Sequence, residues 1–210
     1  MPDAGDTYLQ WFYNTGVWKR MFYRGARVLK SPSDLWNYQE IISELDVQWV
    51  VETGTRHGGS ALYFADLLAA RGARGKVITV DVDPLACQVE DHDKIEFLYG
   101  DSVDPGIVAM IRSMLPVDRG RLFVILDSDH SKEHVLQELR TYVPLLAPGD
   151  YLVVEDTCIN GHPVRPEFGP GPWEAVETFI AEQPGVLRND VERERKFGFT
   201  VAPRGFFIKA

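Results

Sequence analysis

Short runs of apolar residues alternate along most of this chain with longer segments whose apolar residues follow a helical period. The short runs predict strands at residues 48–53, 76–81, 95–99, 121–126, 151–154 and 205–209. The longer segments predict helices at residues 60–70, 106–115, 132–142 and 173–182. Nearly continuous apolar strands separated by helices are typical of a parallel sheet that is covered on both faces. We therefore predict an α/β fold, in which ligands bind at the carboxyl ends of the strands.

The N-terminal part of the chain precedes this alternation and is rich in aromatic residues. The Ser-Pro-Ser-Asp motif at residues 31–34 predicts the start of a helix, with the first serine as cap and the aspartate bonding back to the cap nitrogen. This helix should end near Leu45. We therefore expect a helical extension over residues 1–45 and a Rossmann-like domain over residues 46–210. The extension could form an acceptor pocket, a subunit contact or a helix packed on the core.

The size and charge of the chain restrict its function further. Its 210 residues, 45% of them hydrophobic, suit one α/β domain with a short extension. The net charge is −9 and no long basic run occurs, so nucleic-acid or anionic-membrane binding is not expected. No apolar stretch approaches the roughly 18 residues of a membrane span, and no signal peptide is visible. Cys87 and Cys158 are far apart in sequence, and we interpret them as reduced thiols of a cytoplasmic protein.

The residues that follow the first three long strands indicate a ligand that carries a nucleoside. A glycine-rich turn over residues 52–60 lacks the G-x-G-x-x-G spacing, and its first residue, Glu52, suits an ammonium group better than a phosphate. Asp81 ends the next strand, where a carboxylate commonly binds ribose hydroxyls. Asp101 and Ser102 follow the third strand and could bond an adenine ring. Each segment could alternatively be an ordinary turn or helix cap.

Acidic residues and a histidine follow the next two strands. Asp127, Asp129 and His130 come after the strand at 121–126, and Glu155 and Asp156 come after four apolar residues. Clustered acids repel one another, so we expect them to hold a cation. Oxygen ligands favour Mg²⁺ or Mn²⁺ over zinc. The alternatives are acids that only cap helices and a structural His130.

The segments at residues 52–60, 127–131 and 153–157 resemble the cephalosporin hydroxylase and rhamnosyl O-methyltransferase family. The resemblance covers roughly residues 30–180. It implies a class I methyltransferase with a mostly parallel seven-stranded sheet, helices on both faces, S-adenosylmethionine (SAM) and Mg²⁺. The residues that would bind SAM are Glu52, Thr53, Gly54, Thr55, Arg56, Ser60, Asp81, Asp101, Ser102 and Asp127. The residues that would bind the metal are Asp127 or Asp129, with Glu155 and Asp156.

The resemblance also implies a mechanism, with His130 as general base and Asp127 beside it. A small-molecule hydroxyl with a second oxygen next to it would chelate the ion, which lowers its pKa. His130 would take the proton, and the oxygen would attack the sulfonium methyl. We expect a sugar or natural product as acceptor and a homo-oligomer as the working state. The Pro/Gly-rich loop at 159–172 could close over the acceptor or be a rigid connection.

Other functions remain as alternatives at this level. His130 and His134 fit the H-x-x-E-H pattern of zinc peptidases, but that pattern must lie within a helix. A metal-dependent oxygenase of natural-product tailoring would need two histidines and one carboxylate at the strand ends, which are not predicted there. A non-catalytic SAM-binding partner would not need the acidic cluster. Thermal shifts with SAM and with Mg²⁺ would separate these classes.

Overall fold

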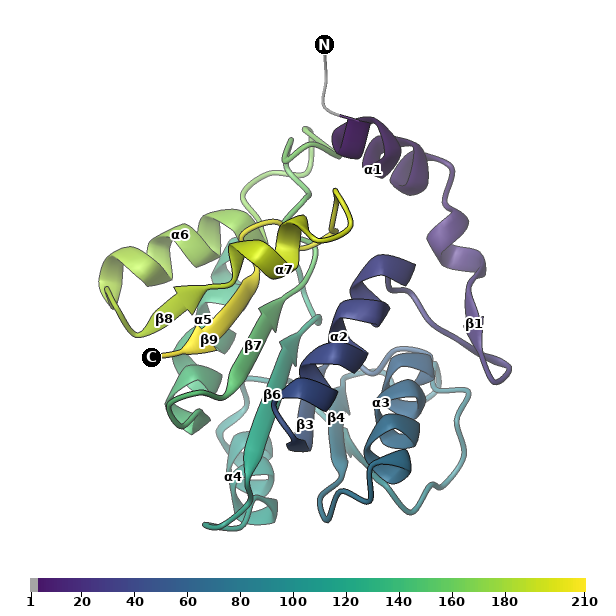
Figure 1. Cartoon of the computed structure of the whole chain (residues 1–210), viewed down its shortest axis with the longest axis vertical. Helices are drawn as coiled ribbons and strands as arrows, with labels where there is room; N and C mark the ends of the chain where they lie inside the picture. Colours follow the sequence, from purple (N-terminus) through teal and green to yellow (C-terminus); the bar gives the residue numbers. More distant parts are fainter. Residues whose placement is uncertain (1–3) are drawn as a thin grey trace.

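The computed structural model describes residues 4–210, and its centre is a seven-stranded sheet with helices on both faces (Figure 1). The strands are β3 (Val47–Thr53), β4 (Val77–Asp81), β5 (Ile95–Tyr99), β6 (Arg121–Leu126), β7 (Tyr151–Val154), β8 (Leu187–Asn189) and β9 (Phe206–Lys209). Their order is β5-β4-β3-β6-β7-β9-β8. The five strands β3 to β7 are parallel, and β9 is antiparallel to both of its neighbours. The predicted mostly parallel seven-stranded sheet is confirmed.

The helices lie close to the positions that the sequence predicted. They are α1 (Ala4–Asn14), α2 (Pro32–Glu44), α3 (Gly59–Ala70), α4 (Pro105–Met114), α5 (Lys132–Tyr142), α6 (Pro172–Glu182) and α7 (Val191–Arg195). Two 3₁₀ turns, η1 (Val17–Arg20) and η2 (Val143–Leu145), and a hairpin of β1 (Phe22–Tyr23) with β2 (Ala26–Arg27) complete the described chain. Sequence reasoning missed β8 and α7, because three and five residues are too short to show a period.

Each face of the sheet buries its own apolar core. Successive side chains of a strand point to opposite faces, so Val50 packs with α2 and α3 while Val51 packs with α4 to α6. In the neighbouring β6, Phe123 packs on the same face as Val50, and Val124 packs on the same face as Val51. Because both faces are buried, the central strands are apolar at nearly every position, as the sequence pattern indicated.

Helix α2 begins at the predicted cap, but one predicted contact is different. Ser31 Oγ accepts a hydrogen bond from Asp34 N at 3.2 Å and donates to Asp34 Oδ2 at 3.0 Å. The carboxylate does not return to the cap nitrogen; its Oδ2 instead accepts from Val201 N at 3.0 Å. Burial raises the pKa of Asp34 to about 6. Asp34 thus ties the start of α2 to a segment far along the chain.

The N-terminal extension divides between two parts of the fold. Helix α1 contacts the loop after β7, where Leu9 and Phe12 share a small apolar cluster with Ile159 and Val164, and both segments lie at the top of Figure 1. Helix α2 instead belongs to the main core, to which it contributes three fully buried side chains: Tyr38, Ile41 and Ile42. The proposed domain boundary at residue 45 stays a prediction.

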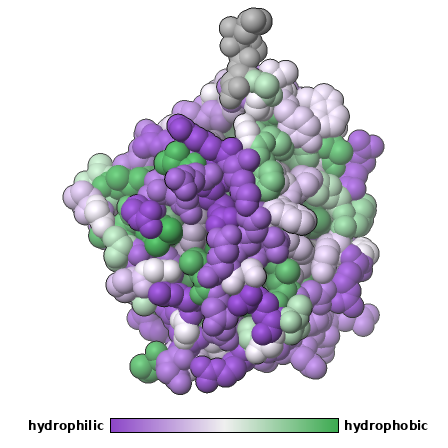
Figure 2. Space-filling view, viewed as in Figure 1, coloured by the Kyte–Doolittle hydropathy of each residue, from purple (hydrophilic) through white to green (hydrophobic). Residues whose placement is uncertain are grey.

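The surface over α2 and α7 is strongly hydrophilic (Figure 2). Arg193 pairs there with Glu40 at 2.6 Å and with Glu44 at 2.5 Å, and Lys196 also pairs with Glu40. Cys87 and Cys158 are free, as predicted. Among residues 4–210, none of the helices has the length and apolar character that crossing a membrane requires.

Candidate active site

The carboxyl ends of β3 to β7 open into a cavity of about 770 Å³. This is the edge of the sheet at which parallel α/β folds bind ligands. Turns after all five strands contribute to its wall, and so do the N-terminal segment and the loop after β7. The predicted site residues that line it are Gly54, Thr55, Arg56, Ser60, Asp81, Asp101, Ser102, Asp127, Asp129, His130, Glu155 and Asp156. Two predicted residues, Glu52 and Thr53, lie just behind the wall.

The glycine-rich turn after β3 lets two strand ends approach each other closely. Gly54 has a φ of +87°, and a Cβ built on it would lie 1.9 Å from the carbonyl oxygen of Asp127. Asp127 N in turn donates to Thr53 O and to Thr53 Oγ1, both at 3.1 Å. Thr53 therefore supports Asp127 from behind, and Gly54 sets the width of the cavity at this point.

Replacing Gly54 by alanine is expected to destabilise the protein by several kcal/mol and to abolish cofactor binding. The new Cβ would collide with backbone, which cannot yield as a flexible side chain does, and the positive φ adds strain. Urea denaturation and SAM titration measure the two effects. Gly72→Ala is the matched control, because Gly72 also has a positive φ of +68° but has no atom within 4 Å of its added Cβ. A loss as small as about 1 kcal/mol at Gly54 would contradict this account.

Glu52 ends β3 as a buried carboxylate with one free acceptor. Its Oε2 accepts from Thr79 Oγ1 at 2.9 Å, and Thr79 shares a second hydroxyl contact of 2.7 Å with Thr55. Its Oε1 is buried without a hydrogen-bond partner among the described residues. Burial raises the pKa of Glu52 to about 7, opposed by the charge of Lys30. A buried acceptor without a partner is costly, so this oxygen suits a donor group of a ligand.

The predicted ribose and adenine residues lie along the next two strand ends. Asp81 accepts from Arg56 N at 2.7 Å and from Asp83 N at 2.9 Å, which fixes its carboxylate at the rim of the cavity. Asp101 Oδ1 accepts from Val103 N at 3.0 Å within its own turn. Ser102 Oγ donates to Glu138 Oε1 at 2.6 Å. These contacts leave each side chain at the cavity wall without assigning it a ligand.

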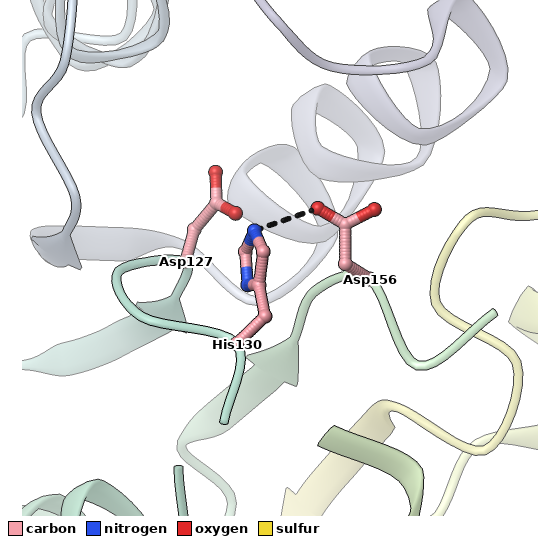
Figure 3. Close-up of side chains that lie close together, drawn as sticks. All are labelled: Asp127, His130 and Asp156. Carbon is pink, nitrogen blue, oxygen red and sulfur yellow. Dashed lines mark ion pairs between the residues drawn. The ribbon is translucent and has the colours of Figure 1, made fainter. Parts of the chain in front are cut away.

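The structure brings Asp127, His130 and Asp156 together (Figure 3), and all three line the cavity. One ligand atom from each lies within 4.8 Å of the others. Asp127 follows β6, Asp156 follows β7, and His130 lies between β6 and α5. His130 Nε2 is 3.2 Å from Asp156 Oδ2. Adjacent strand ends therefore deliver two carboxylates and one imidazole to a single point.

The charges of this group shift its pKa values. Burial alone would lower the pKa of His130, but the nearby carboxylates, Asp156 first among them, outweigh it and raise that pKa. Burial raises the pKa of Asp156, and His130 opposes that shift. The carboxylates around His130 therefore stabilise a positive imidazole beside Asp156.

Glu155 points away from the cluster, into a buried ion pair that the sequence did not reveal. Its Oε1 accepts from Lys30 Nζ at 2.9 Å and from Tyr38 OH at 2.6 Å. Lys30 Nζ also donates to Asp127 Oδ2 at 2.7 Å. Lys30 is 2% exposed and Tyr38 is fully buried. Neither residue stood out in the sequence, because only folding brings the segment before α2 against the ends of β6 and β7.

Asp129, the other candidate metal ligand, lies outside the cluster. Its Oδ1 accepts from Ser131 N at 2.7 Å, a contact that lowers its pKa together with the Ser131 side chain. This bond lies in the turn before α5, whose N-cap is Ser131, so Asp129 is not the cap of that helix. Between Asp127 and Asp129, the geometry favours Asp127 as the ligand. The roles of Glu155 and Asp129 toward a metal stay predictions.

Part of the cavity wall is aromatic. Phe12 and Tyr13 of α1, Trp18 of η1 and Leu29 line it, together with Arg165 of the loop after β7. Other contacts hold that loop to the start of α6: Asn160 donates to Glu174 at 2.8 Å, and the rings of His162 and Trp173 stack with centroids 4.2 Å apart. The N-terminal extension thus contributes to the wall of the cavity, while a closing motion of the loop stays a prediction.

Comparison with known proteins decides the family. The family model for rhamnosyl O-methyltransferase and CmcI matches residues 15–210, which is nearly the whole chain. This chain belongs to the rhamnosyl O-methyltransferase/CmcI family. The resemblance inferred from the sequence is therefore confirmed.

Relatives of this O-methyltransferase are similar over almost their full length. A rhamnosyl O-methyltransferase of Mycobacterium bovis is 49% identical over 211 residues, which cover 98% of this chain and 85% of the relative. One of Mycobacterium leprae is 47% identical over 209 residues, covering 97% and 90%. The chain is accordingly an enzyme that transfers methyl groups to oxygen.

Solved structures agree with this assignment. A CmcI structure with Mg and SAM has a TM-score of 0.71 and 26% identity, covering 91% of this chain and 77% of that one. An O-methyltransferase from Bacillus cereus has a TM-score of 0.58 and 16% identity, covering 100% and 93%. The second likeness concerns the fold alone.

Proposed function

We propose that this enzyme transfers a methyl group from SAM to a hydroxyl of a sugar-bearing small molecule, with the help of a divalent cation. The observation that carries the proposal is the convergence of Asp127, His130 and Asp156 within 4.8 Å in the wall of the cavity. CmcI, to which the chain is similar over 91% of its length, has a structure with Mg and SAM. A binding module without catalytic function would not need this cluster.

The donor set of the cluster suits a hard divalent ion. Two carboxylates, Asp127 and Asp156, supply oxygen ligands, which Mg²⁺ and Mn²⁺ prefer. Lys30 already neutralises part of the acidic charge through Asp127 and Glu155. We propose Asp127 and Asp156 as holders of the ion, while Glu155 stays paired with Lys30 and Tyr38. A divalent ion held there would lower the pKa of an acceptor hydroxyl and orient it.

The cofactor residues would bind SAM from its two ends. Glu52, which lies behind the close turn at Gly54, would use its unpaired Oε1 to accept from the methionine ammonium. Asp81 would accept the ribose hydroxyls, and Asp101 and Ser102 would lie beside adenine. SAM supplies a methyl group that its sulfonium already activates, so most of the rate gain comes from positioning.

His130 would then move the proton of the acceptor hydroxyl. The hydroxyl would approach from the aromatic side of the cavity, where Tyr13 and Trp18 offer apolar surface to a sugar ring. His130 takes its proton, and Asp156, whose Oδ2 lies 3.2 Å from Nε2, stabilises the imidazolium. The curated relatives are named for a rhamnosyl acceptor, so rhamnosyl glycosides are the first compounds to test.

Removal of divalent metal is expected to stop methyl transfer and leave cofactor binding intact. The ion would be held by the carboxylates of Asp127 and Asp156, after β6 and β7, whereas the proposed cofactor carboxylates Glu52 and Asp81 lie at the ends of β3 and β4, so chelation should affect only one of the two functions. Labelled SAM and a panel of rhamnosides and other vicinal diols would be incubated with and without EDTA, and binding of S-adenosylhomocysteine measured by calorimetry. Readdition of Mg²⁺ or Mn²⁺ should restore turnover. Full turnover in EDTA would exclude the metal from the mechanism.

A further inference from the structure

A buried carboxylate lies behind the wall at Ser102 and has no part in the mechanism above. Glu138 of α5 is fully buried, and its Oε1 accepts from Ser102 Oγ at 2.6 Å and from Ser128 Oγ at 2.7 Å. Both serines line the cavity, whereas Glu138 does not. Glu138 can therefore act on a bound ligand only through these two hydroxyls.

The contact with Glu138 determines the direction of both hydroxyl groups. A serine hydroxyl has one proton to donate and two lone pairs to accept, while a carboxylate only accepts. Ser102 and Ser128 therefore give their single proton to Glu138 and keep their oxygen atoms as acceptors. His134 Nε2 lies 3.0 Å from Ser102 Oγ and 3.6 Å from Glu138 Oε1, so it adds a donor to the same group. Each serine retains at least one lone pair for the cavity.

Helix α5 also fixes the turn that carries Ser102. Tyr142 OH donates to the backbone oxygen of Ser102 at 2.7 Å, and Tyr142 is fully buried. Glu138 and Tyr142 are four residues apart, so they lie on the same side of the helix. Two bonds from one helix hold this turn, and the acceptor atoms are fixed in place before a ligand binds.

We propose that Glu138 is a positioning residue that determines base specificity. It holds Ser102 and Ser128 as hydrogen-bond acceptors, so that the wall selects a group with N–H donors, such as the 6-amino group of adenine. A base with a carbonyl oxygen at that place would put its lone pairs against those of the two serine oxygens, and no hydrogen bond could form between them. This inference rests on the proposed function, because it takes adenine to lie at Ser102. Sites built around buried polar groups reject an analogue that leaves those groups unpaired.

The experiment compares S-adenosylhomocysteine with S-inosylhomocysteine, in which a 6-oxo group replaces the 6-amino group. Calorimetry would give the ratio of their dissociation constants for the wild type and for Glu138→Met, which keeps the side-chain length but cannot accept the serine protons. We expect a preference for the adenosyl compound of about 100-fold in the wild type and under about tenfold in the variant. Glu133→Met is the matched control, since it removes an exposed glutamate from the same helix and should keep the wild-type ratio.

The ratio of the two dissociation constants distinguishes a role of Glu138 in base specificity from a role in stability alone. A purely structural role for Glu138 would weaken both ligands equally and leave the ratio unchanged, which would overturn the inference. If Glu138→Met does not fold, Ser128→Ala decides, because losing one acceptor should also lower the ratio, by about tenfold. Equal wild-type affinities for both compounds would overturn only this inference. A wild type that binds neither compound would instead overturn the proposed function.

Discussion

Replacing Lys30 by methionine is expected to lower the free energy of unfolding by about 3–5 kcal/mol, because removing one partner of a buried ion pair leaves uncompensated buried charge. Lys30 is 2% exposed, and its Nζ contacts Asp127 at 2.7 Å and Glu155 at 2.9 Å. Burial alone would lower the pKa of Lys30, but these two carboxylates raise it, so the side chain remains a cation. Urea denaturation of the metal-free protein measures the loss.

The pH dependence of this loss has a definite sign. Burial raises the pKa of Glu155 to about 7 against the effect of Lys30, and without that lysine it should rise further. A carboxyl group with a raised folded-state pKa favours folding at low pH, and this contribution disappears as the pH rises through that pKa. The deficit of Lys30→Met should therefore be largest above pH 7 and shrink toward pH 5.

Lys76→Met is the matched control for this experiment. Lys76 also pairs with a carboxylate, Glu96 at 3.9 Å, but the two side chains are 44% and 43% exposed. Exposed ion pairs contribute about 0–1 kcal/mol, so this variant should unfold close to the wild type. Equal stability of the Lys30 and Lys76 variants would show that the buried pair does not hold the N-terminal segment to the site.

Replacing Asp127 by asparagine is expected to reduce methyl transfer by at least about 100-fold, because one charged ligand of the proposed cation is lost. The variant keeps the size of the side chain and an oxygen for Lys30, so the fold should persist. The affinity for S-adenosylhomocysteine should stay within a few-fold of the wild type. Single-turnover transfer from labelled SAM and calorimetric Mg²⁺ binding provide the two measurements.

Asp129→Asn tests the alternative assignment on the same turn. Asp129 accepts a backbone hydrogen bond from Ser131 and lies outside the cluster of Asp127, His130 and Asp156. We expect this variant to bind Mg²⁺ and to turn over much like the wild type. The reverse result, with an active Asp127→Asn and an inactive Asp129→Asn, would move the proposed metal site to the other aspartate.

Much of the fold and of the site could be predicted because the signals are local. Strands β5 and β6 have the predicted limits, since strands of a covered parallel sheet are apolar at most positions. Residues directly after a strand must lie at the carboxyl edge of the sheet, so the positions of Asp81, Asp127 and Asp156 at the cavity followed from their place in the chain. The family was likewise recognisable from three short segments, and the match over residues 15–210 confirmed it.

The amino-acid sequence by itself determined the α/β alternation, the edge that binds ligands and the set of acidic residues from which the site is made. Only the tertiary structure decided how those acids divide: Asp127 and Asp156 lie around His130, Asp129 accepts from Ser131 N in the turn before α5, and Glu155 pairs with Lys30. The contacts of Lys30, Tyr38 and Glu138 also depend on the tertiary structure, because each bonds a residue at least 10 positions away along the chain. The direction of a side chain and its charge partner depend on residues that become neighbours only when the chain folds, so a sequence pattern does not predict them.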